Sequence, residues 1–151
     1  MRADLSRFMA NALQEADDAL QRGEVPVGAV LAEMDGRIIA TAGNRTIELN
    51  DPTAHAEILV LRRGAALREN YRLNDCILVV TVEPCLMCMG AIIHARINHL
   101  VFGALDPKWG AGGSLYDIPN DPRLNHHIGV TSGILEEDCR QLMQGFFKMR
   151  R

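Results

Sequence analysis

The run Cys76–Val82, CILVVTV, is the segment that most limits how this chain can fold. It is rich in β-branched side chains and has almost no polar face, which is typical of a fully buried strand. Such a strand must be covered on both faces of its sheet, usually by helices. The sequence therefore predicts an α/β fold with helices on both sides of the sheet that contains this strand.

The segments before this run alternate between helical and extended patterns. Apolar residues recur every three or four positions over 5–20, which predicts a helix that stops at Gly23. Two short apolar stretches, 25–32 and 37–42, flank a turn at Asp35–Gly36 and predict an antiparallel hairpin.

The alternation continues to the end of the chain, whose 151 residues are the length of one domain with one core. We therefore predict a single domain, 1–151, folded as a three-layer α-β-α sandwich around a mixed five-stranded sheet. The remaining predicted elements are helices at 53–68, from Pro84 to about Arg96 and from Leu135 to about Arg150, and strands at 100–103 and 130–132.

Composition and charge narrow the classes of function. The chain is 48% hydrophobic and 23% charged, as in an ordinary globular protein, and it has no apolar segment of signal-peptide or bilayer-spanning length. We therefore expect a cytoplasmic protein without membrane contact. A net charge of -3 excludes a broadly basic nucleic-acid binder, so any RNA contact must be local.

Four cysteines in a reducing compartment are expected to be metal ligands or buried thiols rather than disulfides. Cys85 and Cys88 lie three residues apart at the predicted start of a helix, whose positive end favours the thiolate form. His55, in the predicted first turn of the preceding helix, can add an imidazole nitrogen. His, Cys and Cys leave a tetrahedral zinc one open position, which is typical of a catalytic site.

Glu57 lies two residues after His55 in PTAHAEILVL. On a regular helix these side chains point about 200° apart, so they serve one site only if the metal lies beyond the end of the helix. His55 would then reach the ion and Glu57 the water beside it. A carboxylate in that place can accept a proton and return it, which predicts Glu57 as the catalytic acid and base rather than a ligand.

Other interpretations of these residues stay open. A CxxC pair alone is as typical of a redox pair, or of half a structural zinc site, as of a catalytic metal centre. Further histidines and cysteines have ordinary structural explanations: hydrogen-bonded histidines at 94 and 99, small buried hydrophobes at Cys76 and Cys139, and solvated loop residues at His126 and His127.

The pattern H-x-E followed by P-C-x-x-C resembles the signature of the zinc-dependent cytidine and nucleobase deaminases. Over nearly the whole chain the sequence resembles the bacterial tRNA-specific adenosine deaminases. The resemblance implies a cytidine deaminase-like fold, one zinc per subunit, a homodimer, and hydrolytic conversion of adenosine to inosine at the wobble position of a tRNA anticodon. It rests on GEVPVGAV, DPTAHAEI, NYRL, EPCLMCMGAIIHARI, VFGALDPKWGAGGSL and FFKMRR.

The same resemblance implies residues that bind the substrate. It makes Asn44 the side chain that reads the base, places Asp106 near the sugar of the flipped nucleotide, and assigns Lys108 to a phosphate. Without the resemblance, Asn44 and Asp106 are ordinary turn residues. The role of Trp109, the only tryptophan, is open between stacking on a neighbouring nucleotide and packing within its loop.

The end of the chain combines aromatic and cationic side chains. Phe147, Arg150 and Arg151 match the combination of stacking and phosphate contacts by which proteins hold RNA loops with splayed bases. A simpler interpretation is that the helix dipole favours basic residues here and that one phenylalanine faces the core.

Two other functions remain beside tRNA deamination. A deaminase of free nucleosides or bases would keep the zinc chemistry without RNA. A zinc-stabilised RNA-binding module would keep the RNA without turnover, and so would tolerate the loss of Glu57.

Overall fold

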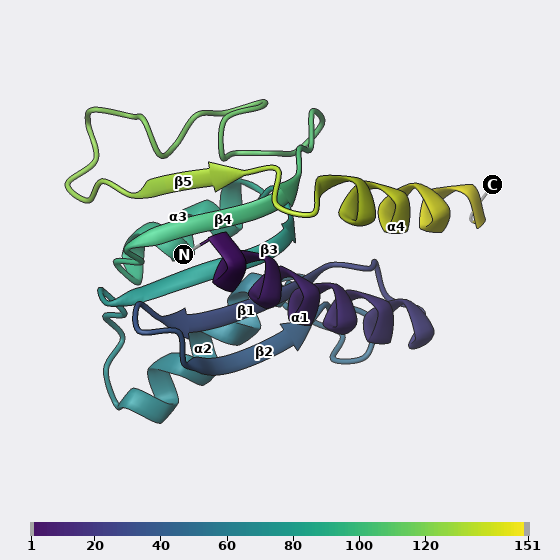
Figure 1. The fold of residues 1–151 in the computed structure, drawn as a ribbon, viewed down its shortest axis with the longest axis horizontal. Coiled ribbons are helices and arrows are strands. Elements are labelled where there is room, and N and C mark those ends of the chain that lie inside the picture. Colours follow the sequence, from purple (N-terminus) through teal and green to yellow (C-terminus); the bar gives the residue numbers. More distant parts are fainter. Residues whose placement is uncertain (1, 150–151) are drawn as a thin grey trace.

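The computed structural model describes residues 2–149. Its helices and strands alternate as the sequence predicts (Figure 1). Their order is α1 (Arg2–Gln21), β1 (Gly28–Glu33), β2 (Ile38–Gly43), α2 (Ala56–Arg68), β3 (Cys76–Val82), α3 (Leu86–His94), β4 (His99–Ala104), β5 (Gly129–Ser132) and α4 (Glu136–Met149).

The strands form one five-stranded sheet in the order β2-β1-β3-β4-β5. Strand β1 is antiparallel to both β2 and β3, whereas β3, β4 and β5 run parallel. The predicted mixed sheet is thereby confirmed. The apolar run that forms β3 is the central strand, and every one of its residues is buried.

Alternate residues of β3 belong to two different cores. Leu78 and Val80 pack into a cluster with residues of α2 and α3, whereas Ile77 and Val79 pack with residues of α1 and α4. Figure 1 shows α1 across the near face of the sheet, with α2 and α3 behind it. The predicted three-layer arrangement is confirmed, because a strand without a polar face has a helical layer on each side.

The starts of α2 and α3 differ from the prediction. Helix α2 begins at Ala56, after His55, and α3 begins at Leu86, after Cys85. His55 and Cys85 are the N-cap residues, with extended backbones (φ -72°, ψ 154° and φ -76°, ψ 176°). Cys85 is extended because it forms a β-bridge with Gly110, which keeps Pro84 outside the helix.

At the other end of the chain, α4 ends at Met149 within the described residues. Arg150 and Arg151, which the sequence analysis assigned to RNA binding, lie outside them. Among residues 2–149, no helix combines the length and the apolar character needed to cross a membrane.

Candidate metal centre and active-site pocket

The N-terminal ends of α2 and α3 bring His55, Cys85 and Cys88 together. Nδ1 of His55 lies 3.7 Å from Sγ of Cys85 and 3.4 Å from Sγ of Cys88, and the three ligand atoms all lie within 4.8 Å of one another. Zinc–sulfur and zinc–nitrogen bonds at tetrahedral angles separate such atoms by about 3.6 Å. The three side chains therefore fit one zinc ion, with a fourth position left for another ligand.

Hydrogen bonding between Cys85 and Cys88 shifts their thiol pKa values in opposite directions. The contact with Cys88 lowers the pKa of the Cys85 thiol to about 4, and the contact with Cys85 raises the pKa of Cys88. The same thiolate raises the pKa of the His55 imidazole. Cys85 is the N-cap of α3, where the positive end of the helix also favours a thiolate. A sulfur that is already anionic is the form that binds a metal.

Glu57, the second residue of α2, is buried beside this cluster with only 3% of its surface exposed. Burial raises the pKa of its carboxyl group to about 7. Its Oε1 is the buried side-chain polar atom that lacks a hydrogen-bond partner among residues 2–149. Buried oxygens are nearly always paired in folded proteins, so this one is suited to a partner that arrives with a ligand.

A cavity of about 370 Å³ opens onto His55, Glu57 and Cys85. Its volume is at the lower end of the range for small-molecule sites, so it suits a single base or nucleoside. Asn44, Asp106, Trp109 and Phe147 also line the cavity, from segments far apart in the sequence.

Asn44 is held by one side-chain and one backbone hydrogen bond. Its Oδ1 accepts a hydrogen bond of 2.8 Å from the backbone N–H of Ala56, one of the unpaired donors at the start of α2. Its backbone oxygen accepts a hydrogen bond of 3.1 Å from Arg22. Because the amide oxygen is engaged, the amide NH₂ is the group that Asn44 offers to a ligand.

Asp106 both makes a turn and lines the cavity. Its Oδ1 accepts hydrogen bonds from the backbone N–H groups of Lys108 and Trp109, at 3.1 and 3.2 Å. Lys108 is exposed and does not line the cavity, whereas Asp106 and Phe147 do.

Glu83 is a residue of this site that the sequence analysis did not single out. Its buried carboxylate holds the loop 106–114 through four hydrogen bonds. They come from the backbone N–H groups of Asp106, Gly112 and Ser114 at 3.0, 2.9 and 2.9 Å, and from the Ser114 hydroxyl at 2.5 Å. The available signal was an acidic residue directly after an apolar strand and directly before Pro84.

Glu24 has a similar role on the opposite side of the cavity. It is 1% exposed and accepts hydrogen bonds from the backbone N–H groups of Ile47 and Glu48, at 3.2 and 2.8 Å, and from the Thr46 hydroxyl at 3.3 Å. These bonds order the turn that follows Asn44.

Of the other histidines, His94 and His127 are exposed. His99 contacts Oγ1 of Thr131 at 2.7 Å, and Cys76 and Cys139 are buried thiols, as expected. The expectation of a solvated His126 is wrong, because its ring is half-buried and contacts the backbone oxygen of Ile97 at 2.7 Å.

Comparisons with known proteins agree with this geometry. Residues 2–104 match the family described as the cytidine and deoxycytidylate deaminase zinc-binding region. The tRNA-specific adenosine deaminase of Haemophilus influenzae is 51% identical over 145 residues, covering 96% of this chain and 84% of that protein. The enzyme of the same name from Agrobacterium fabrum is 47% identical over 149 residues, covering 99% and 97%.

A solved structure of a related protein has the same fold as this chain. It comes from work on A-to-I editing by tRNA:A34 deaminases at the wobble position of transfer RNA. It superimposes with a TM-score of 0.87 at 48% identity, covering 90% of this chain and 98% of the other.

Proposed function

The chain belongs to the cytidine and deoxycytidylate deaminase zinc-binding family, and we propose that it converts adenosine to inosine at the wobble position of a tRNA anticodon. The observation that carries this function is the metal cluster His55, Cys85 and Cys88 in one cavity with the buried carboxylate of Glu57. The names of relatives similar over nearly the whole chain supply the substrate class. A tRNA substrate implies a cytoplasmic enzyme, and we assign the activity to one domain, 1–151.

In this proposal Glu57 moves the protons. A zinc ion held by the three ligands supplies the Lewis acidity that makes water a nucleophile near neutral pH. Oε1 of Glu57 accepts the proton that the attacking water loses at C6 of adenine. Glu57 gives that proton to the ring nitrogen, then takes the proton of the new hydroxyl at C6 and passes it to the amine. The C6–N bond breaks, so that water is consumed and ammonia and inosine are formed.

The proposed substrate contacts follow from the cavity walls. The NH₂ group of Asn44 reads the base from the floor of the cavity, and Asp106 is assigned to the sugar of the same nucleotide. Phe147, 54% exposed at the edge of the cavity, contacts the RNA outside it. Lys108 is exposed nearby and is assigned to a phosphate, as are Arg150 and Arg151 beyond the described residues.

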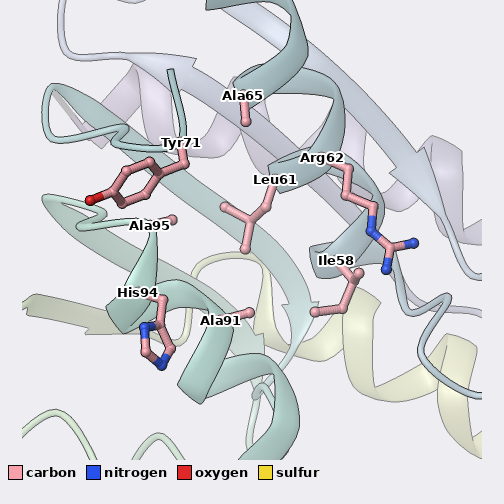
Figure 2. A pocket seen from close by; sticks show the side chains of 8 residues that line it. All are labelled: Ile58, Leu61, Arg62, Ala65, Tyr71, Ala91, His94 and Ala95. Carbon is pink, nitrogen blue, oxygen red and sulfur yellow. The ribbon is translucent and has the colours of Figure 1, made fainter. Parts of the chain in front are cut away.

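We also propose that the enzyme is a homodimer and that a second copy covers the outer faces of α2 and α3. A hollow of about 340 Å³ lies between these helices (Figure 2). Its floor consists of Ile58, Leu61, Ala65, Ala91 and Ala95, and Arg62, Tyr71 and His94 surround it. Both helices carry metal ligands at their N-terminal ends, so a partner here would support the site directly.

The dimer is tested by its assembly state. We expect Ala91→Glu to shift the protein from dimer to monomer in sedimentation measurements and to lower its activity, because the charge would be desolvated between the copies. Ala10→Glu, on an exposed position of α1, is the matched control and should remain dimeric. A monomeric wild type would exclude the dimer.

The deaminase activity is tested on defined substrates. The zinc-loaded protein is incubated with an adenosine-containing anticodon stem-loop and, separately, with free adenosine, cytidine and guanine, and the products are weighed. We expect the gain of roughly one dalton that accompanies deamination only in the stem-loop. Conversion of a free base with an untouched stem-loop would exclude the tRNA function. Equal RNA binding and no turnover in either wild type or Glu57→Gln would indicate a binding module.

A further inference from the structure

We propose that Trp109 is a platform on which a nucleobase adjacent to the target base stacks, and that the Glu83-anchored loop holds the indole ready for it. This inference rests on the proposed function, because it concerns the RNA loop on either side of the target adenosine.

The position of Trp109 excludes the alternative that it packs within its own loop. Its side chain is 70% exposed, although the loop residues on its C-terminal side, Gly110 and Ala111, are buried. It lines the same cavity as His55 and Glu57. A large aromatic ring is therefore kept in solvent at the mouth of the catalytic cavity, where it contributes little to the core.

The backbone that carries Trp109 is nevertheless well ordered. The N–H of Trp109 donates to Oδ1 of Asp106, and the N–H of Gly110 donates to the backbone oxygen of Asp106 at 2.8 Å. Asp106 is bonded in turn to the buried carboxylate of Glu83. These contacts restrict the backbone on both sides of the indole before any ligand binds, which reduces the entropy lost on binding.

The next residue, Gly110, connects this loop to the metal centre. It forms a β-bridge with the ligand Cys85. A side chain at position 110 would meet the carboxylate carbon of Glu83 at 2.4 Å and the backbone oxygen of Asp106 at 2.5 Å. Only a glycine allows this approach, which sets Trp109 at a constant place relative to the metal ligands.

The size of the cavity indicates what the indole meets. About 370 Å³ suffices for the target nucleotide, so its neighbours in the RNA must lie on the edge. That edge presents two exposed aromatic rings from different elements, Trp109 from the loop and Phe147 from α4. Splayed bases of single-stranded RNA stack on such rings, and one stacked base strengthens binding about tenfold.

The test uses the fact that Trp109 is the only tryptophan. Its fluorescence in the zinc-loaded Glu57→Gln protein, which binds without turnover, reports directly on stacking. We expect quenching when the anticodon stem-loop is added. We also expect Trp109→Ala in the active enzyme to raise the KM for the stem-loop about tenfold with little change in kcat, and Trp109→Phe to restore most of the loss. Met34→Ala, at an exposed apolar position in the turn between β1 and β2, is the control.

Stem-loops that lack the base on one side of the target identify the stacked neighbour. On the loop that lacks it, wild type and Trp109→Ala should have equal KM values, whereas on the other abasic loop the tenfold difference should persist. The inference would be overturned if the KM values of wild type and Trp109→Ala differed equally on both abasic loops. It would also be overturned if RNA bound without quenching the fluorescence of Trp109. Emission that changes with protein concentration alone would overturn it too, because a second copy would then cover the ring.

Failure of this inference can be distinguished from failure of the proposed function. If the wild type converts the stem-loop but Trp109→Ala has the same KM, only the stacking role is wrong. If the wild type does not convert the stem-loop at all, the proposed function itself is wrong.

Discussion

Glu57 and Glu83 lie beside the same cavity and are equally buried, but their carboxylates have opposite surroundings. Glu83 accepts four hydrogen bonds from the loop 106–114, whereas Oε1 of Glu57 has no partner among the described residues. A carboxylate saturated with donors is part of the architecture. A carboxylate with one oxygen left without a partner beside a metal cluster is available for proton transfer.

The difference follows from what each residue faces. Glu83 directly follows the central strand β3, and the N–H groups of the loop 106–114 point toward its carboxylate. Glu57 lies in the first turn of α2, whose N-cap is the ligand His55, and it lines the cavity. Burial near the active site therefore does not by itself identify a catalytic acid, and the hydrogen-bond partners do.

The largest effect should come from Glu57→Gln. We expect kcat on the stem-loop to fall by about 10³-fold, because glutamine cannot carry the proton. The melting temperature should stay level or rise, because a buried acid with one unpaired oxygen is replaced by a neutral amide.

Measuring zinc content, melting temperature and turnover on the same preparation tests this prediction. Zinc should remain stoichiometric, since Glu57 is not a ligand in the proposed site. A variant that loses its zinc together with its activity would contradict the distinction drawn between Glu57 and the metal ligands.

Glu83→Gln should show the reverse pattern, with a large loss of stability and a smaller loss of activity. The amide NH₂ would oppose N–H donors now bonded to a carboxylate oxygen, which lowers the free energy of unfolding by about 3 kcal/mol. Because the disturbed loop carries Asp106, we expect the KM for RNA to rise more than kcat falls.

Denaturant unfolding and steady-state kinetics separate these two effects. Asp17→Asn, an exposed acid-to-amide change on α1, is the matched control. It should leave the free energy of unfolding and the KM for RNA unchanged. If Glu83→Gln lowered kcat as strongly as Glu57→Gln while remaining stable, Glu83 would have to act in the chemistry itself.

Glu24→Gln extends the comparison to the opposite side of the cavity. Glu24 makes fewer and on average longer hydrogen bonds than Glu83, so we expect the free energy of unfolding to fall by about 2 kcal/mol. The KM should rise, since the affected turn follows Asn44. An unchanged KM for the stem-loop would contradict a role for Glu24 in holding the turn that follows Asn44.

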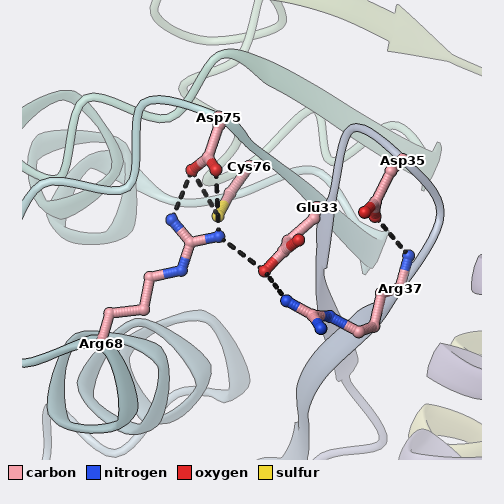
Figure 3. A network of polar contacts seen from close by, with 6 residues as sticks. All are labelled: Glu33, Asp35, Arg37, Arg68, Asp75 and Cys76. Carbon is pink, nitrogen blue, oxygen red and sulfur yellow. Dashed lines mark hydrogen bonds and ion pairs between the residues drawn. The ribbon is translucent and has the colours of Figure 1, made fainter.

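The smallest effect is expected from a partly exposed network of carboxylates and arginines, none of which lines the cavity (Figure 3). Arg68 binds Asp75 at 2.5 Å and Glu33 at 2.8 Å, and Glu33 also binds Arg37. Hydrogen bonds from the arginines lower the pKa values of both carboxyl groups. Pairs this close to solvent contribute little to stability.

The sign of the pH dependence is set by those lowered pKa values. Whatever stability the network contributes is present above the ordinary carboxyl pKa, about 4, and is lost as the pH falls through the lower folded values. We therefore expect wild type and Arg68→Gln to differ slightly in melting temperature at pH 7 and to converge in acid. A difference in melting temperature that increases in acid would contradict the proposed contribution of these ion pairs.

Local sequence patterns were enough to predict the layers and the chemistry of the metal centre. A run without a polar face required two helical layers, and the spacings of His55, Glu57, Cys85 and Cys88 predicted a metal beyond the end of a helix. The predicted helix starts were a few residues early. The N-cap at His55 depends on the preceding turn, and that at Cys85 depends on a β-bridge with Gly110.

Other features were decided only by residues distant in the sequence. Glu83 binds donors 23 to 31 positions away, and Glu24 binds donors 22 to 24 positions away, so the residues next to each glutamate do not show which donors it holds. The half-buried ring of His126 depends on a backbone oxygen 29 positions away.

By itself, the sequence determined which elements form, which faces they bury and which side chains can hold zinc, because propensity and periodicity depend on near neighbours. The tertiary structure decided which buried carboxylate is paired, and it left Trp109 exposed at the mouth of the cavity. Hydrogen-bond saturation and exposure depend on what the folded chain brings into contact, and near neighbours in the sequence do not define those contacts.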